Sequence, residues 1–205
     1  MSTNLVTYTF FLLKMVFYNT LKWFLYSLLP VIINKPQQHK KMTTANTVQQ
    51  LQAEWVTQEK FQRYGQLILP SNDGRAYDSN DAQLNLQNGI PRFYIMRLQR
   101  RGRKFHTITR HVQCTQCLGS LEGKDWLIAV VPPHNDVDTP VIEEIKAFRI
   151  PGNCFIKLAV GTWHAGPYFE HEVVDFYNLE LADTNLVDHF THNFIQSDRL
   201  EFEII

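Results

Sequence analysis

Short β-rich runs follow one another along the chain after the turn dipeptide Asn88-Gly89, and this pattern constrains the fold more than any other feature. The runs span residues 91–98, 104–112, 125–132, 145–150, 154–161 and 171–181. They are rich in β-branched and aromatic residues, which favour strands, and turn-forming residues lie between them. Several short strands with little helix are typical of a small antiparallel barrel or sandwich. We therefore expect an all-β fold, an antiparallel β-barrel.

One short helix is expected ahead of these strands. Residues 43–62 contain neither Gly nor Pro. Their large apolar side chains recur at intervals of three, four and six residues: Val48, Leu51, Trp55 and Phe61. This spacing predicts a helix over residues 46–64, ended by Gly65, and then a strand over residues 65–69.

Composition excludes a disordered chain and gives no global signal for nucleic acid. Hydrophobic residues make up 44% of the 205 residues and charged residues 20%, so the chain can form one apolar core. Its 20 basic residues balance 20 acidic ones, whereas nucleic-acid-binding domains carry a basic excess. The 3 cysteines are too few for a disulfide scaffold. We expect a reducing compartment, and hence a cytoplasmic protein.

The first 42 residues differ in kind from residues 43–205, which we interpret as one domain. They are apolar and basic, and the first acidic residue of the chain is Glu54. Lys14 and Lys22 interrupt the apolar stretch, so it falls short of the about 20 residues that a membrane span needs. Two interpretations stay open. The segment precedes a true start at Met42, or it is a weak membrane-surface anchor.

A histidine-bearing strand, FHTITRHVQCTQC, covers residues 105–117. Because side chains alternate along a strand, His106 and Arg110 share one face, and Thr109 and His111 share the other. The two histidines can therefore approach one metal ion only if a bulge intervenes. The C-x-x-C spacing at the end of this segment has no second pair, so we favour two packed thiols over a redox or zinc site.

A further imidazole lies in the segment GTWHAGPYF, residues 161–169, which we interpret as a turn at the barrel mouth. His164 in this turn is suited to proton exchange near neutral pH or to metal binding. Lys157 lies on an apolar strand and points either inward, toward a carboxylate, or outward. The basic run over residues 100–104 surrounds Gly102 and is interpreted as a solvated hairpin tip.

Several short motifs occur in the order and approximate spacing seen in the ureidoglycolate lyase (ureidoglycolate hydrolase) family. They are Tyr64-Gly65, Asn88-Gly89, Arg92-Phe93, Arg110-His111, Thr115-Gln116, Ala147-Phe148, Thr162-Trp163-His164 and Asp175-Phe176. Over about residues 54–181 the chain resembles this family. The resemblance implies a cupin-type β-barrel and a homodimer. It also implies cleavage of ureidoglycolate to glyoxylate and urea in the breakdown of allantoin and purines.

The implied reaction needs a base for the hydroxyl proton, an acid for the departing nitrogen and a group that holds the carboxylate. Our hypothesis lists as catalytic His164, Gln116 and His111, and as substrate-binding Arg110, Lys157, Trp163 and Arg92. His164 would carry the proton or bind a metal, and either Arg110 or Lys157 would hold the carboxylate. The resemblance permits a divalent metal without requiring one, and we name no metal ligands. The expected partner is a small carboxylate, not nucleic acid or a membrane.

Departures from the family pattern keep other functions open. The family usually has Glu at the position of Thr109, a second His at the position of Ala165, and an Arg where residues 178–181 read NLEL. A barrel without these groups would be a non-catalytic small-anion binding or regulatory protein. A different metal-dependent cupin enzyme, such as an oxygenase, would need two histidines and a carboxylate at one ion.

Overall fold

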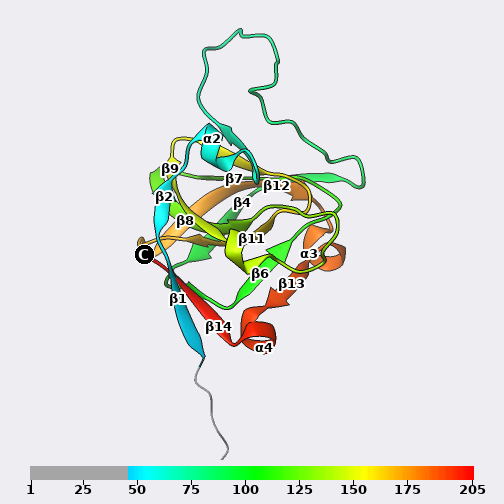
Figure 1. Ribbon diagram of the computed structural model, residues 1–205. Coiled ribbons are helices and arrows are strands. Elements are labelled where there is room, and N and C mark those ends of the chain that lie inside the picture. The colour runs from blue at the N-terminus through cyan, green and yellow to red at the C-terminus, as the bar shows by residue number, and fades with distance from the viewer. Residues whose placement is uncertain (1–45) are drawn as a thin grey trace, which may run out of the picture. The chain divides into compact units, whose positions relative to one another are not determined.

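Three β-sheets form the part of the chain that the computed structural model describes, residues 46–205 (Figure 1). The apolar and basic extension over residues 1–42 lies outside the described residues, so neither interpretation of it is tested. Within residues 46–205 no helix is both long enough and apolar enough to cross a membrane.

The first sheet has five antiparallel strands in the order β3-β10-β7-β12-β4. The strands are β3 (Gly65–Ile68), β10 (Phe155–Leu158), β7 (Gln116–Ser120), β12 (Val173–Leu181) and β4 (Pro91–Gln99). On β4, β7, β10 and β12 the even-numbered residues point to its inner face, and Leu118, Ile156 and Phe176 among them are buried in an apolar core; on β3 the inward residue is Leu67. Odd-numbered residues on β4, β7, β10 and β12 lie on its outer face.

The second sheet has six strands in the order β13-β6-β11-β8-β9-β2. The strands are β13 (Phe190–Asn193), β6 (Thr107–Arg110), β11 (Trp163–Tyr168), β8 (Gly123–Val131), β9 (Lys146–Gly152) and β2 (Ala53–Trp55). All neighbours pair antiparallel except β2, which runs parallel to β9.

A third sheet has the order β1-β14-β5 and is built from β1 (Thr47–Leu51), β14 (Leu200–Ile204) and β5 (Lys104–Phe105). Here β1 runs parallel to β14, and β5 runs antiparallel to it. The remaining elements are the short helices α2 (Gln58–Phe61), α3 (Thr184–Val187) and α4 (Phe194–Asp198), and the 3₁₀ turn η1 (Ile142–Glu144).

Strand β8 shows how the sheets stack. Its residues Trp126, Ile128 and Val130 pack against the five-stranded sheet, whereas Leu127, Ala129 and Val131 pack in a second core with β14 and α4. The six-stranded sheet is therefore covered on both faces. This explains why the sequence of β8 reads as an unbroken apolar run rather than as an alternating one.

The structure confirms an all-β fold but corrects two expectations. No sheet within residues 46–205 closes into a barrel. The helix expected over residues 46–64 is wrong, because this stretch forms β1, β2 and only one helical turn, α2. Pairing of β1 with β14, at the far end of the chain, satisfies the backbone of residues that the apolar spacing had assigned to a helix.

The strands expected over residues 65–69, 91–98, 125–132, 145–150, 154–161 and 171–181 correspond to β3, β4, β8, β9, β10 and β12. Residues 161–169 differ from expectation, because most of this segment forms β11 rather than a turn. Its pairing with β8 shifts register between Ala165 and Tyr168, which accommodates Gly166 and Pro167 within the strand.

Candidate active site

Two histidines meet on the inner face of the six-stranded sheet. His164 on β11 pairs with Thr109 on one side and with the core residue Val130 on the other, and directly paired residues share a face. His111 follows β6 by one residue, and its ring centroid lies 5.1 Å from that of His164. A third ring, His189, lies 5.8 Å from His111.

Backbone carbonyls fix the tautomers of both inner rings. His111 Nδ1 faces the carbonyl oxygen of Asp188, and His164 Nδ1 lies 3.3 Å from that of Thr162. A carbonyl only accepts hydrogen bonds, so each Nδ1 carries the proton and donates it. Each ring therefore keeps an Nε2 lone pair that can accept a proton or bind an electrophile.

Asp188 holds the loop that presents His111. Its buried carboxylate accepts hydrogen bonds from the backbone N–H of Val112 at 2.7 Å and of Gln113 at 2.8 Å, while its own carbonyl faces the His111 ring. One residue thus sets both the path of the backbone after β6 and the orientation of the imidazole. Such support limits the freedom of the ring to rotate.

Burial keeps both imidazoles neutral. Desolvation, together with a smaller effect of the neighbouring His111 ring, lowers the pKa of His164 to about 3. Burial also lowers the pKa of His111, an effect that the hydrogen bond to Asp188 and the carboxylates of Asp188 and Glu180 oppose. A neutral ring near pH 7 has one nitrogen, here Nε2, that can accept a proton.

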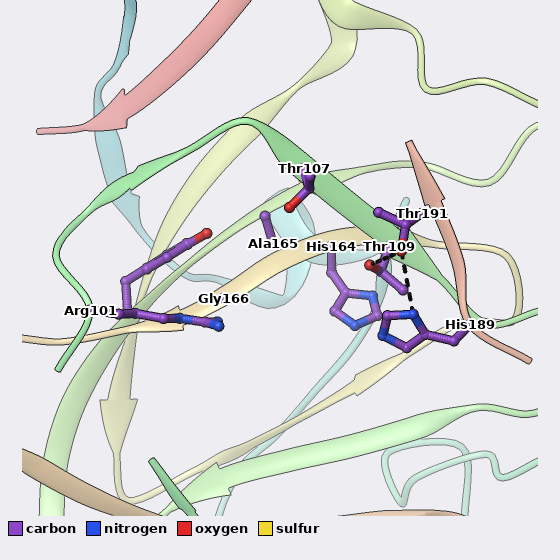
Figure 2. Close-up of a pocket in the computed structure, with 9 residues that line it drawn as sticks. Arg101, Thr107, Thr109, His164, Ala165, Gly166, His189 and Thr191 are labelled. Carbon is purple, nitrogen blue, oxygen red and sulfur yellow. Dashed lines mark hydrogen bonds between the residues drawn. The ribbon is translucent and has the colours of Figure 1, made fainter. Parts of the chain in front are cut away.

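A pocket of about 350 Å³ opens beside His164 (Figure 2). It is lined by residues of the loop before β5, of β6 and β11, and of β13 with the residue that precedes it: Arg101, Thr107, Thr109, His164, Ala165, Gly166, Tyr168, His189 and Thr191. In Figure 2 the guanidinium of Arg101 extends into the pocket from the side opposite His189. The hydroxyls of Thr109 and Thr191 lie 3.1 Å apart, and that of Thr191 lies 3.3 Å from His189 Nδ1. A cation, hydroxyls and imidazoles thus surround a space of small-molecule size.

Arg101 was not among the residues expected in the site, because the basic run around it reads as a solvated hairpin tip. Its neighbours in that run pair with carboxylates: Arg100 with Glu172, Arg103 with Glu170 and Lys104 with Glu203. Within residues 46–205 Arg101 forms no ion pair; its guanidinium lies 5.1 Å from the Tyr168 ring and 3.4 Å from the Pro167 carbonyl. Residue type alone gave no signal that distinguishes Arg101 from its neighbours.

Two other expected site residues, Gln116 and Arg92, lie on the inner face of the five-stranded sheet, around Glu180. Gln116 Nε2 donates to Glu180 Oε2 at 2.9 Å. Arg92 Nη1 lies 4.0 Å from Glu180 Oε1, and its guanidinium covers the Tyr94 ring at 3.8 Å. These residues do not line the pocket of Figure 2, but Glu180 is close enough to act on the His111 ring.

The structure places Arg110 and Trp163 on the opposite face of the six-stranded sheet from His164. The Arg110 guanidinium stacks over the Trp163 ring at 4.6 Å and donates to Asp138 at 2.9 Å. Trp163 is buried in the second core. The expectation that Arg110 and His111 point to opposite faces holds, and it is His111 that reaches His164.

Lys157 points outward, away from the core residues Ile156 and Leu158 that flank it. It is buried on the outer face of the five-stranded sheet beside its strand partner Cys117, and this burial lowers the pKa of the amine. Cys117 and Cys114 are buried free thiols, as the packed-thiol interpretation expected.

The residues at the site do not form a full metal-ligand set. Within residues 46–205 no group of three or more His, Cys, Asp and Glu side chains is arranged to hold a metal ion. Catalytic zinc sites use three protein ligands, and the Nε2 atoms of His111 and His164 supply two. We therefore assign no chemical step to a metal.

These features define a β-sandwich protein with a neutral imidazole pair, one ring of which, His164, lines a pocket together with Arg101. Comparison with models of known protein families matches residues 48–197 to the family described as Ureidoglycolate lyase. The chain therefore belongs to the ureidoglycolate lyase family. A search of curated proteins finds no match.

Proposed function

We propose that this protein is a lyase that cleaves ureidoglycolate to glyoxylate and urea. The observation that carries the proposal is the meeting of His164 and Arg101 in one pocket of a chain from this family. The substrate is a small carboxylate whose reacting carbon bears a hydroxyl and a ureido nitrogen. A pocket of about 350 Å³ is large enough for it.

His164 is the proton carrier in this proposal. Its Nε2 takes the hydroxyl proton, the C–O bond becomes a carbonyl, and the electrons of the breaking C–N bond pass to the ureido nitrogen. The same proton then moves from His164 to that nitrogen, so urea leaves neutral and the ring is regenerated. The low pKa of His164 makes its protonated form a strong acid, which favours this second transfer, and makes the neutral ring a weak base, so the first transfer is the harder of the two.

Arg101 holds the substrate carboxylate. It lines the pocket together with Thr107 and Thr109, whose hydroxyls can donate to the same anion. Within residues 46–205 no carboxylate neutralises Arg101, so its charge is available to a ligand. A guanidinium is suited to this role because it can donate two parallel hydrogen bonds to a carboxylate.

A second function, small-anion binding without catalysis, has one observation in its favour. Thr109 and Ala165, at which the chain departs from the family pattern, both line the pocket. A hydroxyl and a methyl group there supply no further proton-transfer group. In this alternative the same pocket binds the carboxylate through Arg101 and turns nothing over.

The proposal includes a homodimer formed through the outer face of the five-stranded sheet. Phe93 and Ile95 are 64% and 57% exposed there, and the Phe93 and Tyr177 rings stack at 5.6 Å. The Phe155 ring extends this row, 5.9 Å from Tyr177. An exposed aromatic surface of this kind favours association with a second copy. Light scattering after gel filtration should give a dimer, and Phe93→Glu should give a monomer.

Release of urea and glyoxylate from ureidoglycolate by the purified full chain tests the activity. His164→Ala should lower turnover at least about a hundredfold, the scale of losing a proton-transfer group. The matched control is His171→Ala, because His171 is exposed and does not line the pocket. Anion binding without product release would favour the second function. Equal turnover by wild type and His164→Ala would reject the assigned role.

A further inference from the structure

A buried carboxylate organises the inner face of the five-stranded sheet opposite the imidazoles. Glu180 on β12 is 1% exposed and accepts hydrogen bonds from Gln116 Nε2 at 2.9 Å, from Tyr94 Oη at 3.3 Å and from Asn185 Nδ2 at 3.3 Å. The Tyr94 hydroxyl in turn accepts from Asn178 Nδ2 at 3.0 Å. Three donors of this network therefore point directly at Glu180, and the fourth, the Asn178 amide, points at the Tyr94 hydroxyl.

This direction fixes which atoms are left over. An amide cannot turn its oxygen toward a carboxylate without repulsion, so the Gln116 oxygen faces away from Glu180. The Tyr94 hydroxyl donates its proton to Glu180, so its oxygen can only accept, and it accepts from the Asn178 NH₂. This orientation of the amide leaves the Asn178 oxygen without a donor. Within residues 46–205 neither Gln116 Oε1 nor Asn178 Oδ1 accepts a hydrogen bond. The open ends of the network are two acceptors.

Both open acceptors are buried and lie on the inner face. Gln116 is 7% exposed and Asn178 1% exposed. Their neighbours on the same face, Leu118 and Phe176, belong to the core between the two large sheets. A buried acceptor without a donor is costly, and such groups in native proteins call for a partner.

We propose that Gln116 and Asn178 form a subsite that accepts the N–H groups of a ureido ligand. The inference deepens the proposed function and rests on it, because it assigns the ureido end of the substrate to this wall and the carboxylate end to Arg101. A terminal ureido group is rich in N–H donors, which two fixed acceptors match. Glu180, to which this wall donates, is close enough to act on the His111 ring, and that ring lies 5.1 Å from His164 in the pocket lining.

Two stable ligands of equal charge and similar size test this subsite. N-carbamoylglycine carries the ureido group and the carboxylate but lacks the hydroxyl that elimination needs. N-acetylglycine replaces its terminal NH₂ by a methyl group and so removes two N–H donors. Calorimetry on the wild-type full chain should show N-carbamoylglycine binding at least about tenfold tighter, the effect of one hydrogen bond to a buried acceptor.

Variants locate the discrimination. Gln116→Met and Asn178→Leu keep volume but remove an acceptor, and each should bring the affinity ratio toward one. Tyr94→Phe keeps both acceptor atoms but removes the hydroxyl that orients the Asn178 amide. Because this amide can then rotate, the affinity ratio of the two ligands should also fall. Asn185→Ala is the matched control, since it removes a donor to Glu180 without removing an open acceptor, and its ratio should stay at the wild-type value.

The outcomes separate this inference from the lyase activity. If the wild-type protein binds N-carbamoylglycine at least about tenfold tighter than N-acetylglycine but does not turn ureidoglycolate over, the lyase proposal is overturned and the subsite is supported. Turnover by a wild-type protein that binds both ligands equally, or binds neither, would overturn the subsite. If Gln116→Met and Asn178→Leu lose their fold by circular dichroism, Tyr94→Phe decides: an unchanged ratio in a folded Tyr94→Phe protein rejects the inference.

Discussion

His111 and His164 lie with their ring centroids 5.1 Å apart, and each holds its Nδ1 proton against a backbone carbonyl. The two rings come from different strands, β11 and the residue that follows β6. Burial is the main cause that lowers the pKa of both rings, and the neighbouring His111 ring lowers that of His164 as well. The pair is therefore a neutral, directed set of proton acceptors.

This arrangement predicts a loss of stability in mild acid. An unfolded histidine titrates near pH 6.5, whereas folding lowers the pKa of His164 to about 3. The unfolded state therefore binds more protons between these values, and the stabilisation present above about pH 6.5 is lost as the pH falls toward 3. The melting temperature should fall from about pH 7 to about pH 4.5, and His164→Gln should reduce that fall. His171→Ala should retain the wild-type slope. A His164→Gln slope equal to that of wild type would contradict the assigned environment.

Arg101 and Arg100 offer a matched test of the carboxylate clamp. They are adjacent in the chain, yet Arg101 lines the pocket while Arg100 pairs with Glu172 outside it. Arg101→Ala should raise the KM for ureidoglycolate about tenfold to a hundredfold, the effect of losing a charged hydrogen bond, and change kcat less. Arg100→Ala should leave both constants unchanged. Steady-state kinetics of both variants at one ionic strength gives the two constants. Equal effects of Arg101→Ala and Arg100→Ala would contradict the assignment of Arg101 as the group that binds the carboxylate.

Much of the fold was predictable because the signals are local. The apolar run of β8 and the alternation along β4 and β12 follow from which faces are buried. The opposite orientation of Arg110 and His111 followed from strand alternation alone. The expectation that failed, the helix near residue 50, depended on pairing between residues far apart in the chain. The segment of β1 reads as helical until its ladder with β14 is known.

The candidate site was predictable only in part, for a similar reason. His164 and His111 could be singled out because histidine has suitable chemistry wherever it lies. Arg101 could not be singled out. Its neighbours in the basic run pair with Glu172, Glu170 and Glu203, whereas Arg101 pairs with none of them, and this difference arises only in the folded protein. The free acceptors of Gln116 and Asn178 likewise result from a network across three strands that no local pattern encodes.

Gly65 carries a prediction about how closely β3 and β10 approach. A Cβ at this position would lie 1.8 Å from the backbone oxygen of Lys157, a contact that only separation of the two strands can relieve. Gly65→Ala should lower the free energy of unfolding by about 3 kcal/mol or more, measured by urea denaturation. Gly74→Ala is the comparison, because its new methyl group meets nothing within 4 Å. Its left-handed backbone limits the cost to about 1–2 kcal/mol.

Arg110 provides the sharpest contrast between sequence and structure. The sequence suggests a carboxylate clamp, whereas the structure stacks its guanidinium on Trp163, away from His164. Arg110→Ala should therefore lower the free energy of unfolding by about 1 kcal/mol, through lost cation–π contact and packing, and leave the KM for ureidoglycolate unchanged. Asp138→Ala isolates the ion pair and should cost little, because Asp138 is fully exposed. A raised KM for Arg110→Ala without a loss of stability would instead place Arg110 at the substrate, and would require the β6 strand to present its other face to the pocket.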